Sequence, residues 1–307
     1  MIWEKQGIIY VPPLDGSWRD NSALTPTAFQ LSEQVIRVFA SFRDPKGVGR
    51  IGYVDVSAEN PSEVIGVADQ PVVDVGDRGM FDDNGVILGD VLRVDNQVYL
   101  YYVGFQLVEK VKFLAYSGLA ISEDGGNRFH RVSRTPILDR ADEGVYIRAV
   151  HSVIHEDGLF KVWYAVGNGW EVIGETEFPQ YDINCIESED GVTFPREGVK
   201  CVLNDRTNSE YRIGRPRVYR SDAGYVMNYT YGTTDGRYQA GQAFSSDGRE
   251  WLRDDESFSL KPSGTGWDSK HLSYPSVIKT PKGRIFAFYN GNNMGKDGFG
   301  YAELVTA

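Results

Sequence analysis

Short runs of apolar and aromatic residues, separated by turn sequences, recur along the chain. The clearest example is residues 215–254, where three runs rich in Val, Tyr and Phe are separated by Asp- and Gly-containing turns. Runs of this composition are typical of antiparallel strands joined by tight turns. Similar patterns occupy residues 86–129 and 148–194. A unit that recurs at a regular spacing predicts a repeat architecture.

The second predicted strand of each unit sets the period. These strands cover residues 35–42, 98–104, 159–167, 225–232 and 284–291. They lie about 60 residues apart, so the 307 residues hold five units. Four strands in a unit of this length are typical of a β-propeller blade. We therefore predict an all-β fold, a five-bladed β-propeller with four-stranded antiparallel blades.

The last unit is one strand short. It holds three predicted strands before the chain ends, whereas residues 3–10 match the outer-strand pattern of the other units. We expect this N-terminal strand to complete the last blade, which closes the ring and removes two free sheet edges. A single domain, residues 1–307, follows. Its predicted blades cover residues 20–77, 82–142, 143–206, 209–263, and 268–307 together with 1–13.

In three units the third strand ends in a Ser-x-Asp-Gly turn followed by an aromatic residue. These turns lie at residues 122–129, 188–194 and 245–251. The Asp side chain caps a tight turn, and the Gly takes the positive φ that the turn requires. The motif resembles the Asp-box of sialidases. We interpret it as a structural turn.

Composition narrows the function classes. The net charge of −11 argues against a nucleic-acid surface. No apolar run reaches the roughly 18 residues of a membrane span, and the N-terminus lacks a signal-peptide pattern, so we expect a cytoplasmic protein. Cys185 and Cys201 are too few for a disulfide framework or a zinc site, and we interpret them as free thiols, with one disulfide as the alternative. No cluster has metal-ligand spacing, so we predict no metal and no cofactor.

Carboxylates recur just before the predicted inner strands. In a propeller, the loops that lead into these strands gather at one mouth of the central funnel, where a binding site is expected. Cleavage of a glycosidic bond requires one carboxylic acid to protonate the leaving oxygen and a second carboxylate to activate water or attack the sugar. We predict that the catalytic pair comes from Asp83, Glu143 and Glu210. The alternative is that these are ordinary loop residues.

Cations and tryptophans accompany these carboxylates. Arginine suits bidentate capture of a phosphate or an acidic sugar, although the alternative is internal salt bridges to the same carboxylates. Flat indole rings can stack on sugar faces. The predicted substrate-binding residues are Asp20, Asn21, Arg43, Asp82, Arg148, His151, Arg212, Arg215, Asp268, Lys270, His271, Trp18, Trp170 and Trp267.

The blade layout resembles that of the five-bladed propeller glycosidases of glycoside hydrolase families 32, 43 and 130, over nearly the whole chain. The first blade, with ALTPTAFQ, VIRVFASFRD and GRIGYVDVS, is most similar to family 130 phosphorylases and mannosidases. That resemblance implies that Arg43 contacts substrate or phosphate. Residues 81–86 lie where these families place a functional acid, but lack the Asp-Pro-Arg of the family. The Asn-Asp-Pro opening and Glu-Cys motif of family 32 are absent.

The sequence therefore predicts an enzyme of glycoside hydrolase type with paired carboxylates in the central funnel. Its predicted substrate is a terminal or small glycoside, either neutral or anionic. Two alternatives stay open, because a fold does not fix a function. One is an inorganic-phosphate-dependent glycoside phosphorylase, and the other is a non-catalytic carbohydrate-binding propeller. The expected partner is a sugar or glycoside, with phosphate for the phosphorylase. No nucleic-acid or membrane partner is expected, and the oligomeric state is left open.

Overall fold

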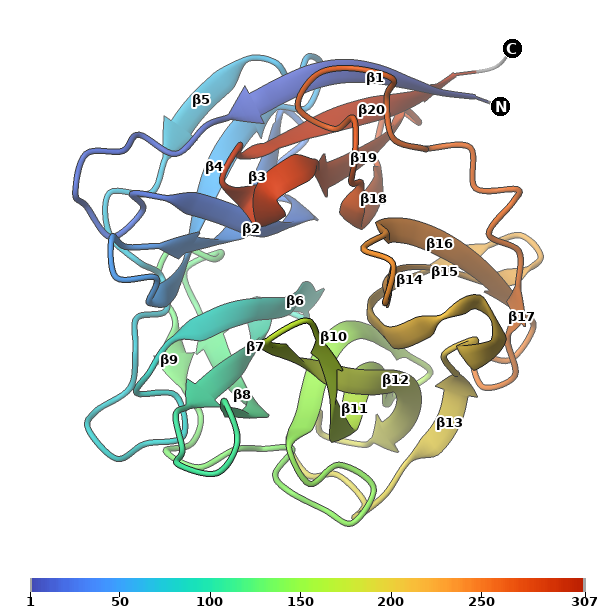
Figure 1. The fold of residues 1–307 in the computed structure, drawn as a ribbon. Coiled ribbons are helices and arrows are strands. Elements are labelled where there is room, and N and C mark those ends of the chain that lie inside the picture. Colours follow the sequence, from blue (N-terminus) through green and yellow to red (C-terminus); the bar gives the residue numbers. More distant parts are fainter. Residues whose placement is uncertain (1, 306–307) are drawn as a thin grey trace.

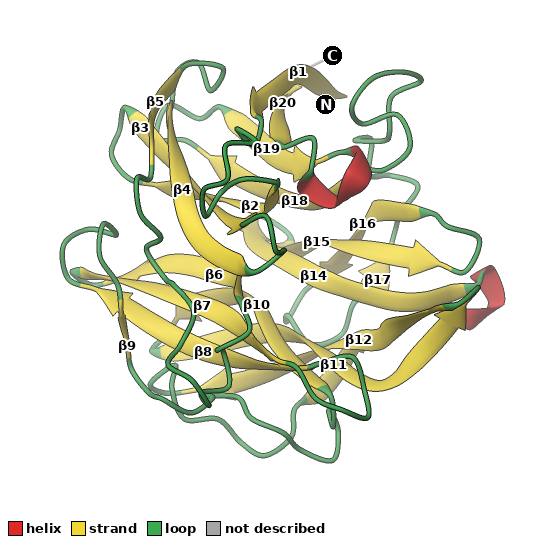
Figure 2. Ribbon diagram, turned by 60° about the vertical axis from the view of Figure 1, so that its left-hand side comes forward, coloured by secondary structure: helices red, strands yellow, loops and turns green. Residues whose placement is uncertain are grey.

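The computed structural model describes residues 2–305 and confirms the predicted all-β class. Helical structure in this part of the chain is limited to two short 3-10 helices, η1 (Arg206–Asn208) and η2 (Asn292–Gly295). Neither is long and apolar enough to cross a membrane. Figure 2 shows that strands and their connecting loops make up the rest.

Twenty strands form five consecutive antiparallel sets. The first set contains β2 (Ser22–Gln30), β3 (Val35–Arg43), β4 (Gly49–Ser57) and β5 (Val64–Val67). The second contains β6 (Val86–Val94), β7 (Gln97–Gln106), β8 (Leu114–Ser122) and β9 (His130–Arg131). The third contains β10 (Ile147–Glu156), β11 (Leu159–Ile173), β12 (Thr176–Ser188) and β13 (Val199–Val202). The fourth contains β14 (Glu210–Ser221), β15 (Gly224–Thr233), β16 (Tyr238–Ser245) and β17 (Leu252–Arg253). The fifth contains β18 (Ser273–Lys279), β19 (Ile285–Asn290), β20 (Phe299–Val305) and the N-terminal β1 (Ile2–Tyr10).

The five sets lie side by side around a common centre, with the first strand of each set nearest that centre (Figure 1). Short parallel bridges from β8 to β10 and from β12 to β14 join the second, third and fourth sets into one twelve-stranded sheet. The first and fifth sets are four-stranded sheets of their own. The hydrogen-bonding pattern within each set is therefore the antiparallel one that the turn sequences predicted.

The N-terminal strand pairs with the last strand, as predicted. The register of β1 and β20 runs from Ile2 opposite Val305 to Tyr10 opposite Phe299. The two ends of the described chain consequently lie together in Figure 1. This pairing covers the edge of β20, which would otherwise expose unpaired backbone groups.

Side chains of one set accept hydrogen bonds from the backbone of the next. Each acceptor lies on a second or third strand, and each donor is a backbone N–H of a neighbouring first strand. The four bonds are Leu88 to Ser41 Oγ (2.8 Å), Val150 to Ser117 Oγ (2.7 Å), Tyr274 to Thr230 Oγ1 (2.8 Å) and Thr25 to Asn290 Oδ1 (2.9 Å). The last bond links the fifth set to the first, so polar contacts also join the beginning and the end of the series of sets.

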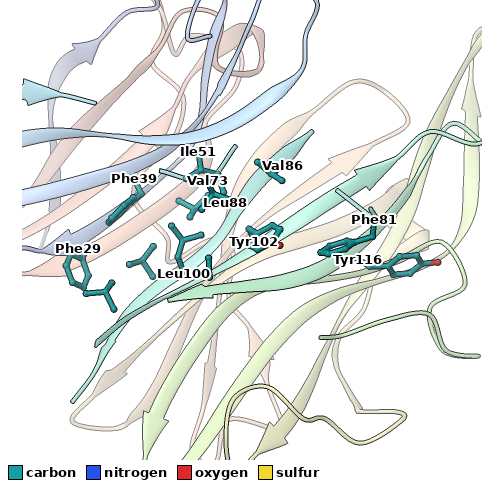
Figure 3. Packing of buried hydrophobic residues seen from close by; sticks show 13 residues of the cluster. Phe29, Phe39, Ile51, Val73, Phe81, Val86, Leu88, Leu100, Tyr102 and Tyr116 are labelled. Atoms are coloured by element: carbon teal, nitrogen blue, oxygen red, sulfur yellow. The ribbon is translucent and has the colours of Figure 1, made fainter. Parts of the chain in front are cut away.

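Apolar side chains fill the spaces between neighbouring sets. Figure 3 shows the cluster between the first and second sets, where Phe39 and Ile51 face Val86, Leu88 and Leu100. These five side chains are fully buried. Burial of an aliphatic or aromatic side chain of this size contributes about 1.5–3 kcal/mol. The packing between sets therefore accounts for much of the stability and fixes how the first strands approach the centre.

The three Ser-x-Asp-Gly turns are hydrogen-bonded turns, as the sequence predicted. In the second of them, Asp190 Oδ1 accepts from the backbone N–H groups of Val192 and Thr193, at 2.8 and 2.7 Å, and from Ser188 Oγ. The backbone hydrogen bonds, that of Thr193 first, lower the pKa of Asp190 to about 2. The hydrogen bonds that this carboxylate accepts within the turn stabilise the local structure.

Cys185 and Cys201 are both free thiols, in line with our interpretation.

Candidate functional site

The first strand of every set carries a β-bulge. The register slips between Leu24 and Thr27, Leu88 and Asp90, Val150 and Ser152, Gly214 and Arg217, and Ser273 and Ser276. A bulge leaves one strand with an extra residue and redirects its side chains, and bulges are frequent beside active sites. The bulged residues are Thr25-Pro26, Gly89, His151, Arg215-Pro216 and Tyr274-Pro275.

Three of these bulges place a residue other than glycine in the left-handed region. The φ angle is 53° at Thr25, 54° at Arg215 and 58° at Tyr274. Such a backbone costs of order 1–3 kcal/mol per residue and persists where the surrounding structure enforces it, commonly at ligand-binding positions. A proline follows each of the three residues. Proline has no N–H, so the bulge leaves no backbone donor unpaired at that position.

The bulges border a central cavity of about 350 Å³. His151, Arg215 and Tyr274 contribute to its wall from β10, β14 and β18, and Arg43 contributes from the end of β3. Ligand pockets in proteins measure roughly 300–1,000 Å³. This cavity is at the small end of that range, which suits one terminal sugar better than a length of polysaccharide.

Cations line the cavity without carboxylate partners. Its wall contains Arg43, Lys112, Arg212 and Arg215. In the described part of the chain, none of these four residues forms an ion pair with a carboxylate that lines the cavity or lies elsewhere. A buried cation without a counter-charge is costly, and an anionic ligand would supply that charge.

Aromatic rings hold two of these guanidinium groups in place. Arg212 lies 4.4 Å from the centre of the Tyr238 ring, and Arg215 lies 5.8 Å from that of Tyr274. Arg215 also donates from Nη1 to the backbone oxygen of Leu88, at 2.5 Å. Burial lowers the pKa of Arg215 to about 10 and lowers that of Arg43 as well. Both remain cationic at neutral pH.

His151 is a neutral polar group in the cavity wall. Its side chain belongs to a residue that is 5% exposed, and its Nδ1 has no hydrogen-bond partner among the described residues. Burial, reinforced by Arg215 and Arg217, lowers the pKa of His151 well below its usual value. The ring therefore offers a ligand a neutral donor or acceptor.

Three tyrosines add polar groups to a wall that is otherwise mostly apolar. Tyr181, Tyr238 and Tyr274 line the cavity, and the hydroxyl oxygens of Tyr238 and Tyr274 are 2.8 Å apart. Burial raises the pKa of all three, so they are neutral hydrogen-bonding groups at physiological pH. Cationic, neutral and hydroxyl groups thus converge on one small space, which is the arrangement of a site for a polar, negatively charged ligand.

An ion pair lies beside this site at the level of the bulges. Arg217 Nη1 pairs with Asp90 Oδ1, and Arg217 Nη2 donates to Thr27 Oγ1 and to the backbone oxygen of Gly89. Asp90 Oδ2 accepts from the backbone N–H of Val153 at 2.7 Å. These contacts connect four first strands. Asp90 and Arg217 therefore serve the structure.

The three carboxylates predicted to be catalytic lie outside the residues that line the cavity. Glu143 pairs with Arg148 at 2.7 Å, and its oxygens also accept from Tyr164, Asn184 and the backbone of Gly198. It borders a separate cavity of about 370 Å³. Both oxygens of Glu143 are engaged in these contacts, which favours a structural role for this carboxylate.

Glu210 is engaged in a similar way, in a two-pronged ion pair with Arg253, at 2.9 and 2.8 Å. Asp83 differs from both. Its Oδ2 accepts from the backbone N–H of Gly79 at 2.8 Å, whereas its buried Oδ1 has no hydrogen-bond partner among the described residues. The sequence showed only that carboxylates recur before the predicted inner strands. It could not show that Glu143 pairs with Arg148 and Glu210 with Arg253, or that all three carboxylates lie outside the residues that line the cavity.

Of the predicted binding residues, Arg43, His151, Arg212 and Arg215 line the cavity. The others make local contacts, mostly with loops of the same set. Asp82 pairs with Arg131, Asp268 pairs with Lys5, Asp20 accepts from Gly16, Asn21 donates to Asp44, and Lys270 and His271 donate from their backbones to Asn292. Trp18 donates to Asp69, Trp170 packs on Phe113 and Tyr146, and Trp267 stacks on Tyr289. These residues, which the sequence predicted to bind substrate, therefore contact neighbouring residues of the protein through ion pairs, hydrogen bonds and aromatic packing.

Sequence reasoning missed the tyrosines and Glu177, which also line the cavity. Tyr238 and Tyr274 lie in β16 and β18, and neither was among the predicted site residues. A signal was nevertheless present. Thr25-Pro26, Arg215-Pro216 and Tyr274-Pro275 recur at equivalent places in three predicted inner strands. Proline inside a strand marks a bulge or an edge, so this recurrence pointed to the bulges.

No protein-family model matches the chain. Two curated relatives are similar to it along their whole length. They are the uncharacterized proteins Rv1502 of Mycobacterium tuberculosis strain H37Rv and MT1551 of strain CDC 1551, each 31% identical over 306 residues that cover 99% of both chains.

Solved structures with the same fold are more distant in sequence. A glycoside hydrolase has a TM-score of 0.73 at 17% identity, and the match covers 99% of this chain and 92% of the other. A structure from a study of mannoside phosphorylases and hydrolases of the GH130 family has a TM-score of 0.72 at 15% identity, covering 98% and 93%. A thermostable family-43 glycoside hydrolase has a TM-score of 0.68 at 16% identity, covering 96% and 90%.

The predicted likeness to these glycosidases is confirmed at the level of the fold. Sequence identities this low show that the fold is shared, and they show nothing about function. The curated relatives show to which family the chain belongs, because they match it at 31% identity over nearly the full length of both chains. The chain belongs to the family of mycobacterial Rv1502, and its fold is that of the β-propeller glycosidases.

Proposed function

We propose that this protein is a carbohydrate-active enzyme of glycosidase type that acts on a terminal or small anionic glycoside in the central cavity. The observation that carries the proposal is the group of partly buried arginines, Arg43, Arg212 and Arg215, which line one small cavity without carboxylate partners. Arginine binds carboxylate and phosphate groups through paired hydrogen bonds. A uronate or a phosphorylated sugar offers such a group.

The five strand sets are the five blades in this proposal, and residues 1–307 form one domain with the predicted blade boundaries. The pairing of β1 with β20 and the hydrogen bond from the backbone of Thr25 to Asn290 support closure of the ring. In a closed ring the first strands surround the central cavity. The position of the cavity then agrees with the general location of ligand sites at the convergence of strand ends and loops.

The paired-carboxylate mechanism predicted from the sequence has little support from the geometry. Glu143 and Glu210 would each have to leave an ion pair and several hydrogen bonds before they could reach a substrate. Breaking a buried pair by removing one partner costs about 3–5 kcal/mol. The cavity contains another carboxylate, Glu177, whose role is argued below.

Phosphorolysis is the second candidate reaction. In the described part of the chain, the cavity wall contains four cations and one carboxylate, Glu177. Hydrolysis by the usual route needs two carboxylates, whereas in phosphorolysis a bound phosphate takes the place of the second carboxylate and its water. The excess of cations over carboxylates favours this reaction as the alternative.

The test is turnover of matched aryl glycosides, each pair identical except for a charge. Aryl glucuronides and galacturonides are compared with the corresponding neutral hexosides, and each is measured with and without inorganic phosphate. We expect the anionic member to be cleaved at least 10-fold faster. A requirement for phosphate would identify the phosphorylase.

Equal cleavage of charged and neutral members would contradict the assignment of an anionic substrate. Binding of uronates without turnover of any compound would instead identify a non-catalytic carbohydrate-binding protein. Isothermal titration calorimetry with free glucuronate and glucose separates this outcome from a failure to bind.

A further inference from the structure

The hairpin that joins β11 to β12 is longer than the equivalent hairpins of the other sets. β11 has 15 residues, whereas β3, β7, β15 and β19 have between 6 and 10. The pairing continues to Ile173 opposite Thr176. The turn residues are Gly174, with φ of 64°, and Glu175. Gly at the first position suits a tight turn between two strands, so the sequence itself specifies this extension.

The extended hairpin reaches the cavity, since Glu177, Phe178 and Pro179 belong to the residues that line it. Figure 1 shows this hairpin on the inner side of the third set, toward the centre of the ring. Alternate residues of a strand share a face. Glu177, Pro179 and Tyr181 therefore lie on one face of β12, and all three line the cavity.

Aromatic contacts fix the hairpin on both sides. Phe178 lies 6.1 Å from the ring of Tyr211, and Arg212 lies 5.6 Å from the centre of the Phe178 ring. On the other strand, Trp170 packs edge-on against Phe113, with 5.2 Å between ring centres. The hairpin is thus held against the second and fourth sets, so that an exposed residue near its end still has a defined position.

The carboxylates of the hairpin have different surroundings. Glu171 accepts from Gln180 and lies 3.9 Å from Arg206, in contacts away from the cavity wall. Glu175 lies in the exposed turn. Glu177 is exposed and lines the cavity, and in the described residues it forms no ion pair. It is the free carboxylate that faces the proposed substrate.

We propose that Glu177 is the catalytic acid of the central cavity, which the extended β11–β12 hairpin carries over the substrate. This inference rests on the proposed function. The partly buried Arg215 and the buried, neutral His151 hold the anionic group of the terminal sugar in the interior. The leaving group then points toward the mouth, where Glu177 lies. Tyr238 and Tyr274 are poorer acids, because burial strengthens their hold on the phenolic proton.

The proposed step transfers one proton. The carboxylic acid of Glu177 donates its proton to the glycosidic oxygen, and the bond between that oxygen and the anomeric carbon breaks with its electron pair left on the oxygen. Water, or phosphate in phosphorolysis, forms the new bond to the anomeric carbon. The proton that the attacking water, or the attacking hydrogen phosphate in phosphorolysis, releases passes through solvent and restores the acid. The products are the free sugar, or the sugar phosphate, and the leaving alcohol.

The test compares Glu177→Gln with Glu175→Gln, which removes the same charge from the same hairpin outside the cavity. Phenyl and 2,4-dinitrophenyl forms of the glycoside that the wild-type protein cleaves are the substrates. A general acid contributes about 10²–10⁴-fold to rate. We expect Glu177→Gln to lower kcat/KM for the phenyl glycoside by at least 100-fold. The dinitrophenyl glycoside, whose leaving group departs without a proton, should lose less than 10-fold.

Glu175→Gln should keep the wild-type rate on both substrates. Calorimetry with free glucuronate should give the same Kd for Glu177→Gln and wild type, because the arginines are intact. Equal losses on both glycosides, or none, would overturn the assignment of Glu177 as the acid and leave the proposed function standing. Absence of turnover by the wild-type protein on every glycoside would overturn both.

Discussion

Glu210 and Arg253 form a buried two-pronged ion pair, in which Arg253 Nη1 lies 2.9 Å from Oε2 and Nη2 lies 2.8 Å from Oε1. The Glu210 side chain is 1% exposed. The backbone N–H of Asp205 donates to the same carboxylate at 2.7 Å. This relationship ties β14 to β17 within one set, and it favours a structural role for Glu210 over a catalytic one.

Replacement of Glu210 should therefore reduce stability and spare catalysis. Removing one partner of a buried pair leaves an uncompensated charge, which costs about 3–5 kcal/mol. We expect Glu210→Ala to lower the free energy of unfolding by that amount in urea denaturation. The exposed Glu250 is the control, and Glu250→Ala should change stability by less than about 0.5 kcal/mol. Normal stability with loss of turnover in Glu210→Ala would return Glu210 to the catalytic role predicted from the sequence.

The sequence predicts the strands well, because their signal is local. The second strands recur every sixty residues or so and their turns carry Asp and Gly, so both the all-β class and the pairing of β1 with β20 follow from the pattern. The partner of a given carboxylate is not a local property. Glu210 and Arg253 are 43 residues apart, and Asp82 and Arg131 are 49 apart.

Of the residues that line the cavity, the sequence predicted only three arginines and His151. Arg43 was predicted from the resemblance to family 130, and His151, Arg212 and Arg215 were predicted from their places in or just before the predicted inner strands. Tyr181, Tyr238 and Tyr274 were missed, because a tyrosine in a strand most often belongs to a core. For Tyr274 the bulge followed by proline distinguishes the two cases, whereas Tyr181 and Tyr238 have no such local signal.

The arginines should control affinity for anions. A hydrogen bond to a charged group contributes about 1.5–3 kcal/mol, so we expect Arg215→Met and Arg212→Met each to weaken glucuronate binding by about 10–100-fold. Calorimetry at low ionic strength measures the Kd. The exposed Arg128 is the control, and Arg128→Met should leave the Kd unchanged. Binding of glucuronate that survives in both cavity variants would contradict the proposed anion site.

His151 should make stability depend on pH. Its folded-state pKa lies well below the usual value of about 6.5, so the unfolded chain binds a proton at a higher pH than the folded protein does. Stability is therefore unaffected above that usual value and falls as pH decreases below it, at up to about 1.4 kcal/mol per pH unit.

The variant His151→Asn removes the titrating group and should flatten this part of the profile. Urea denaturation at intervals between pH 7 and pH 5 measures the slope. His130→Asn, at an exposed position, is the control and should keep the wild-type slope. An unchanged slope in His151→Asn would show that other groups cause the loss of stability.

Closure of the ring should depend on Lys5. Its Nζ lies 2.6 Å from Asp268 Oδ2, and the Asp268 side chain is 4% exposed. Tyr289 also donates to this oxygen, at 3.1 Å. Lys5→Met would leave a buried carboxylate without its cation, and we expect a loss of about 2–4 kcal/mol. The matched control is Lys110→Met, since Lys110 pairs with Glu109 on the surface at 3.8 Å and both side chains are 90% exposed.

A double-mutant cycle separates this ion pair from the pairing of β1 with β20. The double variant Lys5→Met and Asp268→Asn removes the uncompensated charge, so it should recover at least half of the stability lost in Lys5→Met. Removal of residues 1–12 should be more damaging, because it exposes the whole edge of β20 and promotes association between chains. Size-exclusion chromatography measures that association. If the truncated chain stayed monomeric and as stable as the wild type, β1 would not be the strand that closes the ring.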